Sequence, residues 1–131
     1  MSAHRVLRDL LSAFSEVGPG RVDIAATATG AALEENKLIQ FVVPTWGAAT
    51  NILVLPSPQP GKVVIIAGAA TGGELRSSAP ATIGINGGTG AAAESAVAAN
   101  QMVIAICESA TSWKAFTIAS DGTTAGLEAA A

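Results

Sequence analysis

The stretch from Thr50 to Ser77 constrains the fold more than any other part of the chain. Two apolar runs, Ile52–Leu55 and Val63–Ile66, flank a connector that holds three prolines and a glycine. β-Branched residues dominate both runs, and each run is too short for an ordinary helix, so each predicts a strand. Proline cannot donate to a strand ladder, so the connector predicts a stiff turn between two buried strands. Val63–Ile66 is apolar at consecutive positions, which is typical of a strand covered on both faces.

The chain from Arg21 onward repeats this pattern of short apolar runs bounded by turn residues. Further strands are predicted at Arg21–Thr29, Lys37–Pro44, Glu74–Ser77, Thr82–Asn86, Gln101–Cys107 and Trp113–Ala119. Pro44 is expected to end its strand, and Trp113 to cover the core. Gly30–Asn36 predicts a loop or a short helical turn, and the alanine-rich Ala91–Ala99 fits a short helix or an extended edge. No internal repeat of fixed period is found. About eight short strands predict an all-β domain over residues 21–131, either a sandwich or a barrel.

Residues 1–17 predict a short amphipathic helix. Six apolar residues recur at spacings of one, three and four, which places them on one helix face; they are Val6, Leu7, Leu10, Leu11, Phe14 and Val17. Gly18-Pro19-Gly20 ends the pattern. A helix of about four turns is marginal alone and must dock on something. Two alternatives stay open: it packs on its own domain, or it is an arm that docks on a neighbouring subunit. The candidate interface residues are Leu7, Leu10, Leu11, Phe14 and Trp46.

Composition points toward burial against partners and away from nucleic acid. Charged residues make up 13% of the 131 residues, the net charge is −3, and there is no tyrosine. The seven Lys and Arg residues are scattered without a basic stripe, so we expect no nucleic-acid binding. No apolar run approaches the roughly 18 residues that a membrane helix needs, so we expect no membrane span. Few charges and many small residues suit a chain that buries its surface against partners.

The strongest signal for an enzyme is Val63–Gly73, a strand followed by spaced glycines. This order resembles the phosphate turn of a dinucleotide-binding fold, where a helix start binds pyrophosphate. The residues that follow reach Pro80 without a helical apolar face, and the chain lacks the tyrosine that short-chain dehydrogenases use. We therefore expect no cofactor and no enzymatic activity.

Other residue types that could carry chemistry are isolated in the sequence. His4 is the only histidine and has no partner at metal-ligand spacing, so we expect no metal site. Cys107 lies in an apolar strand and is interpreted as an inert core thiol. Glu34 and Glu35 are adjacent carboxylates on a charged loop, where solvation is the usual role. The Trp46 ring, in a loop after a strand, is interpreted as a core lid rather than a ligand platform.

Read from Ile52 onward, the order of features resembles the small β-modules of tailed-bacteriophage virion proteins. The sequence pattern that these modules share is roughly L-P, then P-G-K at the start of an apolar strand, then N-G, then a strand with C-x-x-x-x-x-W. The matching residues are Leu55-Pro56, Pro60-Gly61-Lys62, Asn86-Gly87, Cys107 and Trp113. The resemblance covers about Ile52 to Ala119. Ala67-Gly68 stands where this family usually has an asparagine.

The resemblance implies an all-β fold, a non-enzymatic role in the virion, and homo-oligomers that are often trimers. A chain of 131 residues lacks the length of a fibre shaft, which favours a capsid decoration (cement) protein. Its partner would be the major capsid protein, and it would be made in the host cytoplasm and lie on the capsid surface. The alternative is a tail or baseplate module that recognises host glycan, through Trp46 and the glycine-rich tip. The third hypothesis is an enzyme of the dinucleotide-binding class.

Far-UV circular dichroism should show mostly β signal with one minor helical component. The physical reason is the set of short β-rich runs from Arg21 to Ala119, against a single helical pattern at the start. A helix content above about one third would contradict the predicted fold class.

Overall fold

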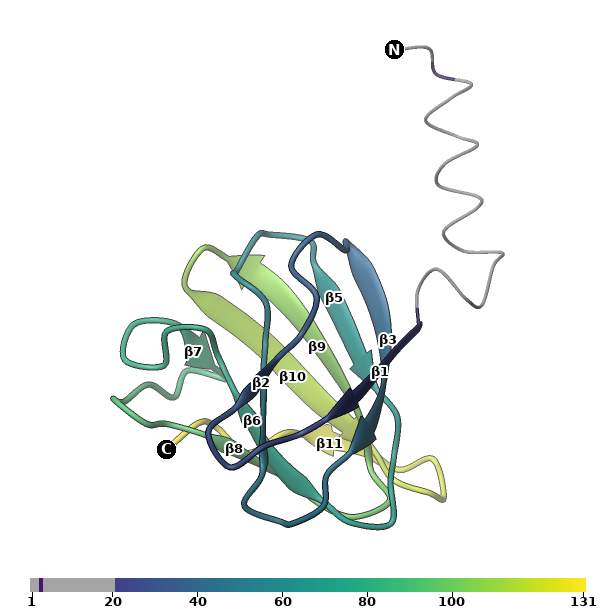
Figure 1. Ribbon diagram of the computed structural model, residues 1–131. Helices are drawn as coiled ribbons and strands as arrows, with labels where there is room; N and C mark the ends of the chain where they lie inside the picture. Colours follow the sequence, from purple (N-terminus) through teal and green to yellow (C-terminus); the bar gives the residue numbers. More distant parts are fainter. Residues whose placement is uncertain (1–2, 4–20) are drawn as a thin grey trace.

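The computed structural model describes residues 21–131 together with Ala3, and these residues form two packed β-sheets (Figure 1). The predicted all-β class is confirmed. The predicted helix over residues 1–17 lies, apart from Ala3, outside the described residues. The strands of the described part are β1 (Arg21–Ala25), β2 (Ala31–Ala32), β3 (Ile39–Thr45), β4 (Ile52–Val54), β5 (Val63–Ile66), β6 (Gly73–Arg76), β7 (Gly84–Ile85), β8 (Ser95–Val97), β9 (Met102–Ser109), β10 (Ser112–Ile118) and β11 (Thr124–Gly126).

The first six strands alternate between the two sheets. Odd-numbered strands enter a seven-stranded sheet of order β1-β3-β5-β9-β10-β11, in which β7 also pairs with β10. The even-numbered strands among the first six, β2, β4 and β6, enter a four-stranded sheet of order β2-β4-β6-β8. Neighbouring strands of this first half are parallel in both sheets. The chain therefore winds around the core, and each circuit adds one strand to each sheet.

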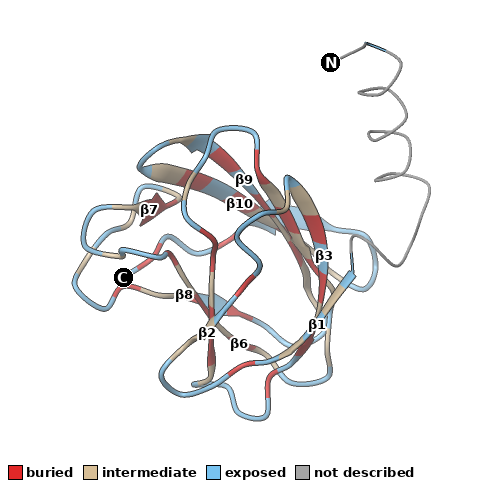
Figure 2. Cartoon of the chain, turned by 45° about the horizontal axis from the view of Figure 1, so that its top comes forward, coloured by how far each residue is buried: buried red, intermediate tan, exposed pale blue. Residues whose placement is uncertain are grey.

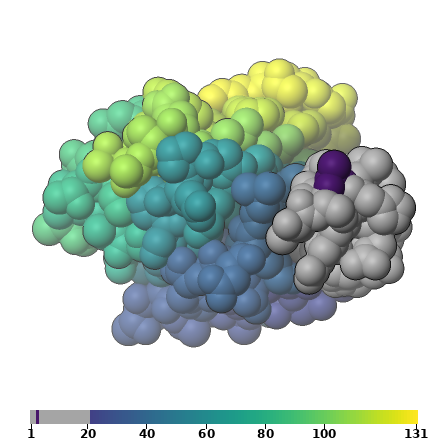
Figure 3. All heavy atoms as spheres, turned by 90° about the horizontal axis from the view of Figure 1, so that it is seen from above, coloured from purple at the N-terminus to yellow at the C-terminus, as the bar shows by residue number. Residues whose placement is uncertain are grey.

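The winding ends at β6, and the rest of the chain is mostly antiparallel. β9 and β10 form a hairpin, and β9 closes onto β5 in antiparallel register. β8 pairs with β6 at the edge of the smaller sheet, while β11 returns along β10. In the space-filling view, segments from the middle and the end of the chain lie side by side (Figure 3).

The core lies between the sheets. Burial alternates along the long strands, as the colours in Figure 2 show, because successive side chains of a strand point to opposite faces. The large side chains that are fully buried include Trp113, Leu53, Leu55, Ile66, Leu75 and Ile85. Two sheets packed face to face leave a layer about 10 Å thick, which these side chains fill.

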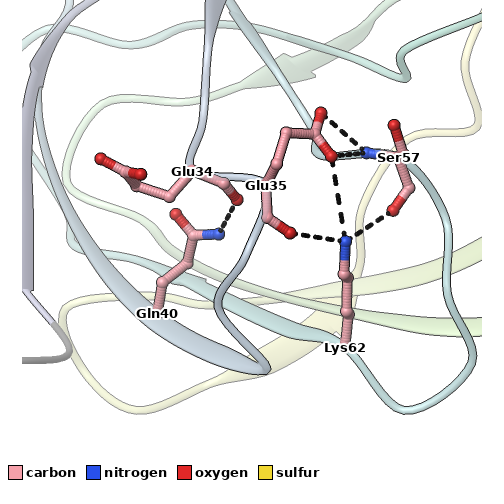
Figure 4. Close-up of polar contacts among 5 residues, drawn as sticks. All are labelled: Glu34, Glu35, Gln40, Ser57 and Lys62. Carbon is pink, nitrogen blue, oxygen red and sulfur yellow. Dashed lines mark hydrogen bonds and ion pairs between the residues drawn. The ribbon is translucent and has the colours of Figure 1, made fainter.

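A buried lysine secures the proline-rich connector between β4 and β5 (Figure 4). Lys62 is 6% exposed, and its ammonium donates to the carbonyls of Glu35 (2.9 Å) and Ser57 (3.0 Å). The Glu35 carboxylate accepts from the Ser57 N–H at 3.0 Å and lies 3.9 Å from the lysine nitrogen. Beside this cluster, the buried Gln40 amide donates to the Glu34 carbonyl at 2.9 Å. These bonds satisfy the buried charge and tie the connector to the preceding loop.

Several element predictions are confirmed with small shifts in their ends. The run Val63–Ile66 is β5 as predicted. The extended alternative for the alanine-rich stretch is correct, because that stretch contains the edge strand β8. The two runs that flank the connector are indeed strands, but β4 and β5 lie in different sheets, so the connector crosses from one layer to the other.

Other element predictions were wrong. Gly30–Asn36 is not simply a loop or helical turn, because it contains β2, and β11 was not predicted. Pro44 does not end its strand, since β3 continues to Thr45. The Ala67 N–H donates to the Val42 carbonyl where β5 ends. Beyond that point the side of β3 that faces β5 needs no further donor, so a proline is tolerated there.

The Asn-Gly pair after β7 forms a tight turn whose asparagine side chain bonds to two other segments. Asn86 has a positive φ of 50°, followed by Gly87 at 85°. The Asn86 amide donates to the carbonyls of Ala115 (2.8 Å) and Leu127 (2.7 Å), and its oxygen accepts from the Ala115 N–H (2.9 Å). One side chain therefore joins β7, β10 and the C-terminal tail.

Replacing Trp113 with alanine should lower the free energy of unfolding by about 3–5 kcal/mol, because the whole side chain is buried and the site cannot fully collapse. Chemical denaturation monitored by circular dichroism measures the change. Lys114→Ala is the matched control, since the adjacent side chain is exposed and should change stability by less than about 0.5 kcal/mol. Equal effects of the two substitutions would contradict the placement of Trp113.

Candidate functional site

The main candidate site is the outer face of the seven-stranded sheet, the face that points away from the four-stranded sheet. The alternation that buries one set of side chains sends the neighbouring set outward. On β3, β5, β9 and β10, most of the outward residues are also apolar. We call these residues the apolar face; they are Ile39, Phe41, Val43, Val63, Ile65, Met102, Ile104, Ile106, Phe116 and Ile118.

The register places these side chains in continuous rows. The central row runs across four strands through Phe41, Ile65, Ile104 and Phe116, each paired with the next. Residues that pair in register point to the same face of a sheet, so their side chains are neighbours. The rows on either side are shorter. One pairs Ile39, Val63 and Ile106 and ends at Lys114 on β10, and the other pairs Met102 with Ile118. The apolar face is therefore one contiguous surface.

No layer of the described residues covers this surface. All strands of residues 21–131 belong to the two sheets, and this part of the chain contains no helix. Phe41 is 39% exposed and Ile106 is 38% exposed, and the adjacent Leu38 is 58% exposed. A monomeric soluble protein rarely leaves so continuous an apolar surface open, and such surfaces mark interaction sites.

Charged residues stand at the edges of the apolar face. On β1, Arg21 and Asp23 form an exposed ion pair at 2.9 Å, next in register to Phe41 and Val43. Across the sheet, at the hairpin end of β9 and β10, Lys114 lies 3.8 Å from Glu108. An apolar centre with a polar rim is the usual anatomy of a protein–protein interface.

The outer face of the four-stranded sheet is different, because it carries charged residues on its central strand β6. Arg76 on β6 forms an ion pair and hydrogen bond with Glu94. Partial burial raises the pKa of Glu74 above its usual value, and the nearby Glu94 and Glu128 raise it further. This face therefore mixes charged and apolar residues, since Ile52 and Val54 pair in register with Glu74 and Arg76, whereas the outer face of the larger sheet is mainly apolar.

The structure divides the predicted interface residues into two groups. Leu7, Leu10, Leu11 and Phe14 lie outside the described residues. Trp46 is described and is only 2% exposed. Its ring lies directly over Gly73, where an added Cβ would come within 2.0 Å of it. Trp46 is therefore a core side chain, in keeping with its interpretation as a lid, and offers no open ring to a ligand.

The enzyme-like segment has a structural role. After β5 the chain runs through residues 67–72 directly into strand β6, so no helix start follows the glycines. A Cβ added at Gly72 would lie 2.1 Å from the Val97 carbonyl oxygen. These glycines serve close packing between strands and have no open space for a pyrophosphate.

The remaining candidate groups are also structural. Cys107 is 1% exposed, and burial raises the pKa of its thiol, so the thiol is not activated. A hollow of about 290 Å³ near Lys62 is lined by Glu35, Asn36, Lys37, Leu38, Gln59 and Lys62. Both Glu35 and Lys62 already bond within the chain there. Among residues 21–131 and Ala3, no group of three or more His, Cys, Asp or Glu side chains could hold a metal ion.

Within the described part of the chain, no helix is long and apolar enough to span a membrane. No protein-family model, no curated protein and no solved structure matches this chain. The function must therefore be argued from the residues and the geometry.

The apolar face was not identified from the sequence, although a signal for it was present. The consecutive apolar residues of Val63–Ile66 indicated a strand covered on both faces. The structure describes a cover for the inner face, at Val64 and Ile66, and none for the outer face, at Val63 and Ile65. Which residues of the other strands join them depends on register, which only the fold defines.

Adjacent isoleucines on β5 provide a matched test of this face. Ile66→Thr should lower the free energy of unfolding by about 2–4 kcal/mol, because it places a hydroxyl and a void in the core. Ile65→Thr should cost less than about 1 kcal/mol in the isolated monomer, since that side chain points outward. Chemical denaturation at low protein concentration, with analytical ultracentrifugation at high concentration, measures both effects. If Ile65→Thr proved as destabilising as Ile66→Thr at low concentration, the face would not be open in the monomer.

Proposed function

We propose that this protein is a structural subunit of a bacteriophage virion, and specifically a capsid decoration protein that binds and stabilises the head shell. The observation that carries the proposal is the apolar face with its charged rim. Such a surface is suited to assembly. The proposed partners are the major capsid protein and further copies of this chain, with a trimer preferred.

The mechanism is stabilisation by mass action. A subunit that binds the assembled shell and not its separated parts shifts the equilibrium toward the shell. A specific interface needs roughly 1,600 Å² of total buried surface. An apolar sheet face of four strands, with neighbouring rim residues, is a suitable centre for a contact of that size between copies of this chain, and the resulting oligomer is the unit that binds the shell.

The residues that carry the resemblance support the proposal, because each has a structural role here. Lys62 of the P-G-K motif secures the connector, and Asn86 of the N-G motif joins three elements. Cys107 and Trp113 pair in register on the β9–β10 hairpin, which accounts for the five residues between them. A motif made of framework residues is what a family of structural modules would share.

The glycan-binding alternative has less support. It used Trp46 as an aromatic platform, and that ring is buried. The glycine-rich tip remains, but Asn86 within it is already bonded to the strand and the tail. No specific observation favours this alternative over the decoration protein.

The test is co-sedimentation with shells assembled from the major capsid protein encoded in the same genome. We expect saturable binding and a shell that disassembles at a higher temperature when occupied. Ile104→Lys, on the apolar face, should reduce occupancy at least tenfold. Ala96→Lys is the control, because Ala96 is exposed on the other sheet. Absence of binding at saturating protein, or binding to tails or host polysaccharide instead, would reject the decoration role.

A further inference from the structure

We propose that residues 1–17 of one copy dock on the apolar face of a second copy, so that subunits associate by exchanging arms. The inference deepens the proposed function and rests on it in one respect, that the apolar face is buried in an assembly of this protein. The segment that covers the apolar face is, in this proposal, residues 1–17 of a neighbouring copy.

The first argument is complementarity between the segment and the face. The sequence predicts an amphipathic helix with six apolar residues on one side. Seventeen helical residues extend about 25 Å. The apolar face spans four strands across and five residues along, from Ile39 to Val43, which is roughly 15 Å by 13 Å at normal strand spacing. A helix laid along the diagonal would cover it and add the missing third layer.

The second argument is where the segment joins the sheet. Residue 20 precedes Arg21, the first residue of β1, and β1 is the edge strand of the same seven-stranded sheet. Arg21 pairs in register with Phe41, at the end of the central apolar row. The described part therefore begins beside the end of the central apolar row, and a neighbour packed along that edge would be within reach of the preceding segment.

The third argument is reach, which favours a neighbour over the same chain. Four residue steps join Val17 to Arg21, a span of at most about 14 Å when fully extended. Docking over β5 of its own sheet requires roughly 10 Å sideways, for two strand spacings, and roughly 10 Å upward, for one packed layer. That path uses the whole length of the link. It also requires the chain to turn over the sheet, while Pro19 favours an extended conformation at the preceding residue.

The charges at the rim are compatible with this occupant. The segment carries Arg5 and Arg8 together with Asp9 and Glu16, so its charges balance. The rim likewise offers both signs, on β1 and at the β9–β10 hairpin end. Neither surface would repel the other, and rim pairs of this kind set orientation more than affinity.

Crosslinking in the full-length protein tests the inference directly. One tagged chain carries Phe14→Cys and a differently tagged chain carries Ile65→Cys; the native Cys107 is buried and serves as background. Mixed under mild oxidation, the two should form a disulfide between the two tags. A chain with both substitutions that links only within itself at all concentrations would overturn the proposal in favour of self-packing. Links between two Ile65→Cys chains alone would overturn it in favour of face-to-face sheets.

Charge substitutions give an independent readout. Leu10→Lys in the full chain should convert the oligomer to monomer by light scattering, with the thermal unfolding of the β-sheets unchanged when measured at low concentration. Asp9→Lys is the matched control, because it changes the adjacent residue on the polar side of the predicted helix and should leave the oligomer intact. An oligomer that persists with Leu10→Lys, or a wild-type protein that is monomeric at every concentration, would overturn the arm exchange.

These outcomes separate the two proposals. Arm exchange without any binding to shells would leave the further inference standing and reject the decoration role. Binding to shells by a monomer without intermolecular crosslinks would do the reverse.

Discussion

The packing of the two sheets against each other is the interaction on which the rest of the structure depends. The four-stranded sheet covers one face of the seven-stranded sheet, and Trp113, Leu53 and Leu75 fill the layer between them. The winding of the first six strands follows from this packing, since each circuit must add an apolar strand to both layers. The far side of the smaller sheet carries the partly buried ion pair of Arg76 and Glu94, so the two outer faces of the molecule differ in polarity.

The larger sheet carries apolar residues on both faces, so the single sheet packed against it covers only half of them. Its parallel strands carry hydrophobic residues on both faces, as parallel sheets do when they are covered on both sides. Only the inner face has a cover within the described residues. The outer face has no such cover, and this is the observation on which the proposal of an assembly subunit rests.

The residues that carry the family resemblance have structural roles in this fold. Lys62, Asn86 and Trp113 are each buried or bonded within the domain, at points where strands from different circuits meet. They hold strands, loops and the C-terminal tail of this domain together. The motif residues therefore stabilise the domain, while the apolar face and its rim are the surface available to a partner.

The sequence by itself determined the β class, most strand positions, the burial of Trp113 and the structural nature of Cys107. Those features follow from local composition, because short β-branched runs between glycines and prolines have few other conformations. It did not determine β2 and β11, the path through Pro44, the parallel winding, or the apolar face. These depend on which strands lie side by side and in what register. The partners of Phe41 are Arg21 and Ile65, residues that lie far from it in the chain, and only tertiary packing brings them together. The circuits also differ in length, as those from Arg21 to Phe41 and from Ile39 to Val63 do, so the winding produces no repeat of fixed period in the sequence.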